Sequence, residues 1–221
     1  MADKIEFYTE SQRELQTQND TIGLADALAS AAVSHELSDQ HRQFIESRDF
    51  FFLSTVNGEG EPTVSYKGGA VGFVRTLDAN RLLFPSYDGN GMFLSVGNVV
   101  ETSKVGLLFI DFETPNRLRV QGTAQVLDQG VDRSPFPGAD LLVEVQVTSA
   151  FVNCARYIHK HTRVEDSRYI PDDQGKQPLP SWKRIDGFQD VLPIGESERV
   201  AATGGTIDEE EYRRLLQEGK S

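Results

Sequence analysis

A series of short strand-like segments runs from residue 50 to residue 151, and its regular spacing is the feature that most constrains the fold. The segments cover residues 50–56, 62–67, 71–77, 82–86, 105–112, 117–127 and 141–151. Turn-forming sequences separate them, among them Asn57-Gly58 and Asp88-Gly89-Asn90-Gly91. Short strands at even spacing, joined by turn residues, are typical of an antiparallel barrel or sandwich.

Two of these segments differ in their hydrophobic pattern. Residues 105–110 are apolar on both faces, whereas residues 117–124 partly alternate between apolar and polar side chains. A strand that is apolar on both faces is covered on both sides. The pattern therefore predicts a second layer over this strand, supplied either by a helix or by a partner subunit.

Helical patterns flank the strand region. Residues 10–48 are compatible with two or three helices, and Thr9 and Ser38 are placed as their side-chain caps. The chain becomes polar beyond Val152, and an acidic start predicts a final helix over residues 206–218.

The charge balance limits the partners of the chain. It carries 22 Lys and Arg against 34 Asp and Glu, a formal charge of −12, and has no basic run. This disfavours nucleic acid and anionic membrane surfaces, although a few placed cations can still bind a small anion. With the single cysteine Cys154, no signal-like apolar run in residues 1–30 and no stretch of membrane-spanning length, we expect a cytoplasmic protein.

Six sequence segments, in order, resemble the FMN-binding split barrel of the pyridoxamine 5′-phosphate oxidase-like superfamily. They are residues 48–56, 64–69, 72–74, 84–92, 106–112 and 117–124. Residues 180–184, Pro-Ser-Trp-Lys-Arg, are also similar to one bacterial branch that is described only as oxidase-related.

The resemblance implies a mainly β (α+β) fold, a six-stranded antiparallel split barrel with an N-terminal helical segment and peripheral helices. It also implies a homodimer with FMN at the subunit interface and flavin redox chemistry. On this basis residues 1–47 are a helical extension, residues 48–155 the FMN-binding barrel, and residues 156–221 a tail that packs on the barrel or on the partner subunit.

The resemblance places Lys67 near the flavin, where a cation favours a negatively charged reduced ring. Ser65 and Gly68 flank it as further candidates. The alternative is a solvated lysine at the end of a strand.

The sequence Asp88-Gly89-Asn90-Gly91-Met92 precedes a helix-compatible segment, so backbone N–H groups at a helix start could hold the FMN phosphate. In the oxidase this loop supplies an Arg-Lys pair, and Asn90 and Gly91 stand at the matching positions. The charge compensation of the phosphate is therefore unassigned. An ordinary turn is the alternative reading.

Arg117 stands where the family places a polar residue against the flavin, and period-2 alternation puts Arg119 and Gln121 on its face. A salt bridge is the alternative for Arg117 and the preferred role for Arg119. Ser86 and Tyr87 are further neighbours of the ring. Trp182, the only tryptophan, either covers the flavin or anchors the tail.

No metal site is expected. His159 and His161 would share one face of a strand without an acidic or cysteine partner, and Cys154 is expected to be a small buried side chain. The segment Arg156-Tyr157-Ile158-His159 has the wrong spacing for the substrate signature of the B6 oxidase. We therefore expect an FMN-dependent oxidoreductase that acts on another substrate. The alternatives are a non-catalytic flavin-binding or stress-response module, or a protein that binds haem or deazaflavin.

Overall fold

The computed structural model describes residues 7–127 and 130–220. The contacts within the chain divide it into two compact units, residues 1–165 and 166–221. Each unit is described by itself below.

Three helices precede the sheet, as the sequence predicts. They are α1 (Glu10–Gln18), α2 (Ile22–Ala32) and α3 (Asp39–Glu46). The predicted caps are confirmed, because Thr9 Oγ1 accepts the backbone N–H of Gln12 at 3.4 Å and Ser38 Oγ accepts that of His41 at 3.1 Å. Each cap satisfies a backbone donor that the first helical turn leaves without a partner.

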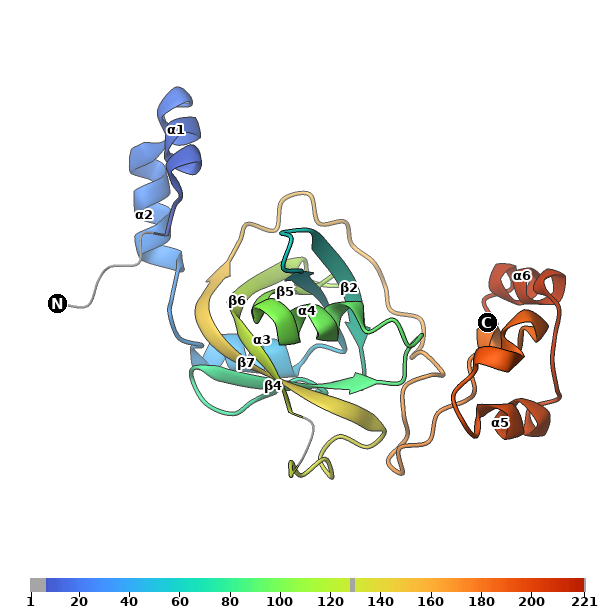
Figure 1. The fold of residues 1–221 in the computed structure, drawn as a ribbon. Coiled ribbons are helices and arrows are strands. Elements are labelled where there is room, and N and C mark those ends of the chain that lie inside the picture. Colours follow the sequence, from blue (N-terminus) through green and yellow to red (C-terminus); the bar gives the residue numbers. More distant parts are fainter. Residues whose placement is uncertain (1–6, 128–129, 221) are drawn as a thin grey trace. The chain divides into compact units, whose positions relative to one another are not determined.

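A single antiparallel sheet forms the centre of the first unit (Figure 1). Its strands lie in the order β2-β1-β5-β6-β7-β4-β3. Their bounds are β1 (Phe50–Val56), β2 (Pro62–Gly68), β3 (Arg75–Thr76), β4 (Arg81–Tyr87), β5 (Lys104–Asp111), β6 (Asn116–Leu127) and β7 (Ala139–Val152). Together with the helices, this sheet confirms the predicted antiparallel α+β class.

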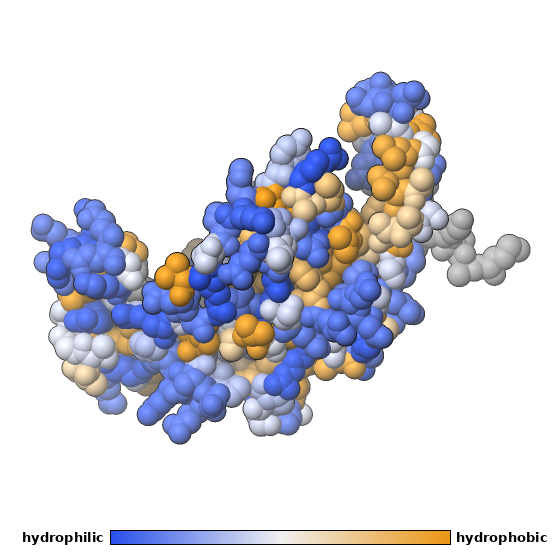
Figure 2. Space-filling model, turned by 180° about the vertical axis from the view of Figure 1, so that it is seen from behind, coloured by the Kyte–Doolittle hydropathy of each residue, from blue (hydrophilic) through white to orange (hydrophobic). Residues whose placement is uncertain are grey.

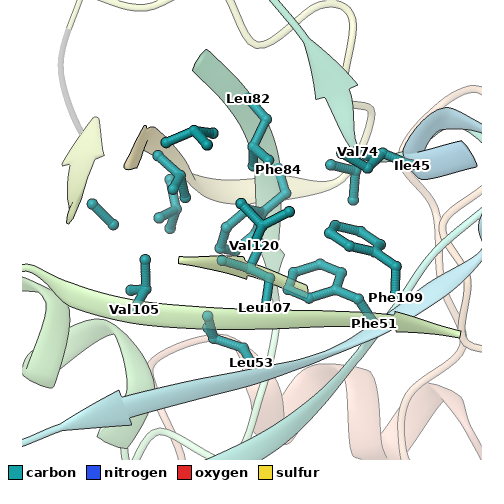
Figure 3. Close-up of a cluster of buried hydrophobic side chains, with 14 of the residues drawn as sticks. Ile45, Phe51, Leu53, Val74, Leu82, Phe84, Val105, Leu107, Phe109 and Val120 are labelled. Carbon is teal, nitrogen blue, oxygen red and sulfur yellow. The ribbon is translucent and has the colours of Figure 1, made fainter. Parts of the chain in front are cut away.

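The sheet curls around an aromatic core. The ring of Phe51 on β1 meets that of Phe84 on β4 edge-on, with centroids 5.0 Å apart, although three strands separate β1 from β4 in the sheet. Phe109 on β5 joins the same group, with its centroid 5.1 Å from that of Phe51 (Figure 3). The sheet must therefore be strongly curved, because a flat sheet would hold β1 and β4 far apart.

The six-stranded barrel is not confirmed in detail. The sheet has seven strands, and pairing among the described residues ends at β2 on one side and at β3 on the other, so that no ladder closes a barrel. The segment predicted as a strand over residues 71–77 is reduced to β3. Gly72 has a positive φ of 82° and Phe73 N–H bonds to Ala70 O, so a turn occupies most of this segment.

The side of the sheet away from the core carries an exposed apolar surface. It is formed by Phe50 and Phe52 of β1, Val64 and Tyr66 of β2, and Leu108 of β5, and is called the outer face below. Val64 is 69% exposed and Tyr66 63% exposed. The predicted burial of β5 thus holds on the inner side, where Val105 and Leu107 lie in the core, and on the outer side at Ile110, while Leu108 on the outer side stays partly exposed.

Helix α4 (Leu94–Thr102) lies in the opening of the curled sheet (Figure 1). It contacts β1, β2 and β6. Its buried residues, Ser95 and Val99, face these strands. None of the helices in the described part of the chain is long and apolar enough to cross a membrane.

The second unit is helical. It contains two short 3₁₀ helices, η1 (Ser181–Arg184) and η2 (Asp186–Val191), followed by α5 (Glu196–Ala202) and α6 (Glu209–Gln217). Helix α6 confirms the predicted terminal helix, and Asp208 caps it. The others were not predicted, because their apolar residues are too few to form a helical pattern.

Replacing Phe51 by alanine tests the importance of the aromatic core. Phe51 is fully buried, so its loss removes transfer free energy and leaves a cavity, and the free energy of unfolding should fall by about 3–5 kcal/mol. Urea denaturation followed by near-UV circular dichroism measures the change. Val164→Ala, at a side chain that is 93% exposed, should change it by less than about 0.5 kcal/mol. Equal effects of the two substitutions would contradict this account of the core.

Candidate functional site

The inner side of β2 carries a row of polar residues, Thr63, Ser65 and Lys67, that faces α4 and the interior of the sheet. The hydroxyls of Ser65 and Ser95 are 2.6 Å apart, which joins β2 to the first turn of α4. Polar groups in a largely apolar interior need such partners. The row is therefore held at a defined position against the helix.

A second polar link fixes the same helix further along. The hydroxyls of Thr55 and Thr63 are 3.0 Å apart, and Asn98 Nδ2 donates to Thr55 Oγ1 at 3.0 Å. Thr55 and Ser95 are both buried. Ser95 and Asn98 were not predicted from the sequence, although polar residues in the apolar segment 94–100 were a usable signal.

Lys67 is the charged member of the inner row. It pairs across the strands with Phe51, so its side chain leaves the sheet on the core side and is only partly exposed. Burial lowers the pKa of its ammonium group from the ordinary value. Lys67 forms no salt bridge with any residue that the structure describes. It is thus a partly desolvated cation without a counter-charge, and not the solvated lysine of the alternative reading.

Ser86 and Tyr87 end β4, where a β-bulge lies between them. The ring of Tyr87 packs against the main core, and burial raises the pKa of its hydroxyl. Both Tyr87 and Lys67 are therefore on the core side of the sheet, one on β4 and the other on β2.

The loop between β4 and α4 contains Asn90, Gly91 and Met92. Asn90 Oδ1 accepts the backbone N–H of Met92 at 3.1 Å, and Gly91 has a positive φ of 76°. This is an Asx-type turn, which Gly91 allows because a left-handed conformation suits glycine. The turn reading is therefore correct for these residues, but it does not exclude a ligand at the helix start.

The start of α4 is left open to a ligand. Its N-cap residue, Phe93, has a left-handed backbone and gives no side-chain hydrogen bond to the helix. The backbone N–H groups of the first turn consequently lack a capping acceptor, and the helix dipole makes this end positive. An anion is the natural partner for such a helix start.

Arg117 lies on the opposite side of the sheet from Lys67. The residues Leu118 and Val120 of β6 point into the core, so Arg117, Arg119 and Gln121 point outward, as the predicted alternation requires. Neither arginine forms a salt bridge with any described residue, so the predicted salt bridge of Arg119 is absent from the described part of the chain. Its guanidinium instead lies over the ring of Phe151, 5.9 Å from the centroid.

The Nε atom of Arg117 is buried without a hydrogen-bond partner, and so is Oδ1 of Asn153. Buried polar atoms without partners are rare in folded proteins, because each costs about 1–3 kcal/mol. Arg117 thus has a donor to offer to a further group. Its position also shows that one chain does not place Arg117 and Lys67 around the same ligand.

Gly68 and Trp182 complete the predicted set. A Cβ on Gly68 would lie 2.8 Å from the ring of Tyr66, so glycine leaves room for that ring at the end of β2. Trp182 belongs to the second unit, on η1, where its ring meets Phe188 edge-on and the Lys183 ammonium lies 5.8 Å from its centroid. Its predicted role over a flavin stays a prediction.

Three residues outside this set differ from expectation. His159 and His161 lie in an irregular segment and not on a strand, because β7 ends at Val152. Cys154 is exposed and not buried, and hydrogen bonds from Arg156 lower the pKa of its thiol. Within residues 7–127 and 130–220 no group of three or more His, Cys, Asp or Glu side chains is arranged to hold a metal ion.

These observations define an α+β protein in which a curled antiparallel sheet holds a helix in its opening, with a desolvated lysine and an uncapped helix start on the inner side. Residues 37–146 match the family model described as pyridoxamine 5′-phosphate oxidase. The chain therefore belongs to this family, as its strand segments predicted.

Several solved structures are similar to part of the chain. A candidate pyridoxamine 5′-phosphate oxidase from Lactobacillus delbrueckii is 23% identical, with a TM-score of 0.43, over 53% of this chain and 95% of that one. An FMN-binding protein from Syntrophomonas wolfei is 14% identical, with a TM-score of 0.38, over 64% and 97%. HutZ, the haem storage protein of Vibrio cholerae, is 20% identical, with a TM-score of 0.38, over 52% and 94%. A comparison with curated proteins finds no match.

The lowered pKa of Lys67 makes a prediction for the ligand-free protein. The folded state holds the proton of Lys67 less tightly than the unfolded chain does. The charge therefore opposes folding below the lowered pKa, and this opposition fades as the pH rises towards the ordinary value of 10.5. Lys67→Met should raise the urea midpoint at neutral pH, and the gain should shrink at higher pH.

The matched control is Lys104→Met, at an exposed lysine, which should leave the midpoint nearly unchanged. A Lys67→Met protein that is less stable than the wild type at neutral pH without ligand would show that the ammonium has a counter-charge after all.

Proposed function

We propose that this protein binds FMN and uses it as an oxidoreductase, acting on a small molecule or on a nicotinamide cofactor. The observation that carries the proposal is the partly buried Lys67 ammonium without a counter-charge, on the inner row of a sheet of the pyridoxamine 5′-phosphate oxidase family. An anionic ligand at this position would supply the missing charge. We further propose a cytoplasmic protein, with residues 1–47 as helical extension, 48–155 as FMN-binding barrel and 156–221 as tail.

The residues of the chain fit the two parts of FMN. The flat ring needs apolar walls and directed hydrogen bonds, and Lys67, Ser65 and Tyr87 offer a cation, a hydroxyl and an aromatic side chain on one side of the sheet. The phosphate needs donors, and the uncapped start of α4 offers backbone N–H groups in place of the oxidase's Arg-Lys pair. Bound FMN supplies hydride and single-electron transfer, and the chain orients it and compensates its charge.

A homodimer with FMN at the interface accounts for two further features. The outer face exposes apolar side chains on β1, β2 and β5, as a surface does that packs against another subunit. Arg117 also points to the side of the sheet opposite Lys67. We therefore propose that each site combines Lys67 of one copy with Arg117 of the other, so that the unpartnered Nε of Arg117 finds its acceptor across the interface.

The substrate is not pyridoxamine phosphate in this proposal. The segment Arg156-Tyr157-Ile158-His159, which has the wrong spacing for the oxidase signature, lies in irregular structure. Steady-state reduction of the bound flavin by reduced nicotinamide and by a panel of small reductants tests for an enzyme. Tight flavin retention without any turnover would instead identify a non-catalytic flavin-binding or stress-response module.

A second ligand class is favoured by one observation. The side chain of Asn90 is turned to Met92, so the loop that carries two cations in the oxidase carries none here. A haem or a deazaflavin places its charge differently from FMN, and either could bind beside Lys67 and the uncapped start of α4. The absorption spectrum of the purified protein separates the three ligands, because a flavin, a deazaflavin and a haem have distinct bands.

Variants of Lys67 and Arg117 test the proposed FMN site. Lys67→Ala and Arg117→Ala should each raise the FMN dissociation constant by about 10- to 100-fold, since a hydrogen bond to a charged group contributes about 1.5–3 kcal/mol. Flavin fluorescence titration of the apoprotein measures it, with Lys104→Ala as the control. Unchanged affinity and unchanged reduction potential in both variants would show that the site is misplaced.

Mixed dimers test whether two copies share each site. A dimer of one Lys67→Ala copy and one Arg117→Ala copy has one site with both alanines and one native site. Differently tagged copies, co-expressed and purified through both tags, should therefore bind one FMN per dimer with wild-type affinity. If Lys67 and Arg117 served a site within one chain, no native site would form in the mixed dimer.

A further inference from the structure

Helix α2 is apolar except on the side of Asp26 and Ser30, yet the chain leaves it largely uncovered. Of its 11 residues, only Asp26 and Ser30 have polar side chains. None of the 11 is buried, and Ile22, Leu24 and Leu28 are 40%, 61% and 55% exposed. The apolar side of a helix is normally covered by the protein or by an interface, because exposed apolar surface is costly in water.

Within the described residues, α1 packs on α2 and covers one side of it. Tyr8, just before α1, donates its hydroxyl to Ala25 O at 2.8 Å, and Arg13 of α1 pairs with Asp26 at 2.7 Å. These contacts involve the partly exposed Ala25 side of α2 and hold the pair, residues 7–33, together as an arm. The leucines Leu24 and Leu28, four residues apart, share another side. Figure 2 shows apolar surface along this pair of helices.

The base of the arm is attached to β7, beside the outward-pointing residues Arg117, Arg119 and Gln121 of β6. Ser34 forms an antiparallel bridge with Ala150, and His35 Nδ1 lies 2.9 Å from Thr148 O. The ring of Phe7 meets that of Phe151 edge-on, with centroids 5.6 Å apart, and Phe151 also lies under Arg119. The arm therefore begins next to the side of the sheet that holds the outer face.

We infer that the arm grips a second copy of this chain, with the Leu24 and Leu28 side of α2 lying on the partner's outer face. This inference rests on the homodimer proposed above and adds a contact to it. The outer face offers apolar side chains of matching character, including Val64 and Tyr66. Two-fold symmetry places the arm of each copy on the other, so the same contact forms twice in the dimer.

The surface area of α2 is too small for the helix to form a stable interface alone. A helix of this length presents a strip of about 16 Å by about 10 Å. A stable interface needs roughly 800 Å² from each partner, several times that strip. The helix therefore needs a neighbouring surface that belongs to the same interface, and the outer face of the sheet supplies it.

Charge also fits a second copy. The chain has an excess of acidic residues, yet Arg119, which pairs with Leu108 across the strands of the outward side, has no salt bridge with a described residue. Glu14 of α1 likewise forms none within the described part of the chain. The carboxylate of Glu14 and the guanidinium of Arg119, which has only the Phe151 ring beneath it, are complementary charges that two copies could pair.

Disrupting the leucines tests the inference in the full-length protein. Leu24→Glu and Leu28→Glu should each raise the dimer dissociation constant by on the order of tenfold or more, since each leaves a charge in an apolar contact. Analytical ultracentrifugation over a dilution series measures it. Val164→Glu, at an exposed site outside the arm and the outer face, is the matched control and should leave it unchanged. Both leucines are exposed, so the fold tolerates the change.

A labelling experiment gives an independent reading of where α2 lies. In a Cys154→Ser background, the single cysteine of Leu28→Cys should react with maleimide at least about tenfold more slowly in the dimer than after dilution to monomers. The single cysteine of Val164→Cys should react at one rate in both states. Rapid labelling of residue 28 in the dimer overturns the inference, and so does a wild-type chain that stays monomeric.

Flavin retention, measured on the same samples, separates this inference from the proposed function. A wild-type dimer that holds FMN but is insensitive to Leu24→Glu and Leu28→Glu overturns the arm contact alone. A dimer weakened by both substitutions supports the arm contact even if the spectrum shows no flavin, in which case the FMN proposal fails by itself.

Discussion

The packing of Phe51 against Phe84 and Phe109 is the contact on which the rest of the first unit depends. The contact with Phe84 joins β1 to β4, which are far apart in the order of the sheet, so it forces the sheet to curl, while Phe109 of the adjacent β5 extends the same cluster. A curled sheet has a concave side that must be filled, and α4 fills its opening. The candidate residues Lys67 of β2 and Tyr87 of β4 both lie on this concave side of the sheet.

Polar groups on that concave side differ in whether they have a hydrogen-bond partner. The hydroxyls of Ser65 and Thr55 have partners on α4, which satisfies them and fixes the helix at the same time. Lys67 has no such partner, and its lowered pKa shows what incomplete solvation costs a charge. A cation of this kind is a poor choice for stability alone, so its presence is best explained by a ligand that compensates it.

The two sides of one sheet carry different parts of the proposed site. Lys67 points inward and Arg117 outward, and strand geometry does not allow both to reach one ligand within the chain. The exposed outer face and the apolar helix α2 are further surfaces that one copy leaves uncovered. The homodimer that we propose would cover this apolar area and complete the site at the same time.

Local sequence determined most of the elements of this protein. Strands were predictable where alternation and turn residues agree, as at Phe50–Val56, and helix starts where a cap such as Thr9 or Ser38 precedes the helix, because both signals act over a few residues. The family was also recognisable from short segments. Only the tertiary structure decided that β1 meets β4, that Ser95 and Asn98 support the inner row, and that Lys67 is desolvated while Cys154 is exposed. Burial and pairing of these side chains depend on residues far away in the chain, and no local pattern encodes such distances.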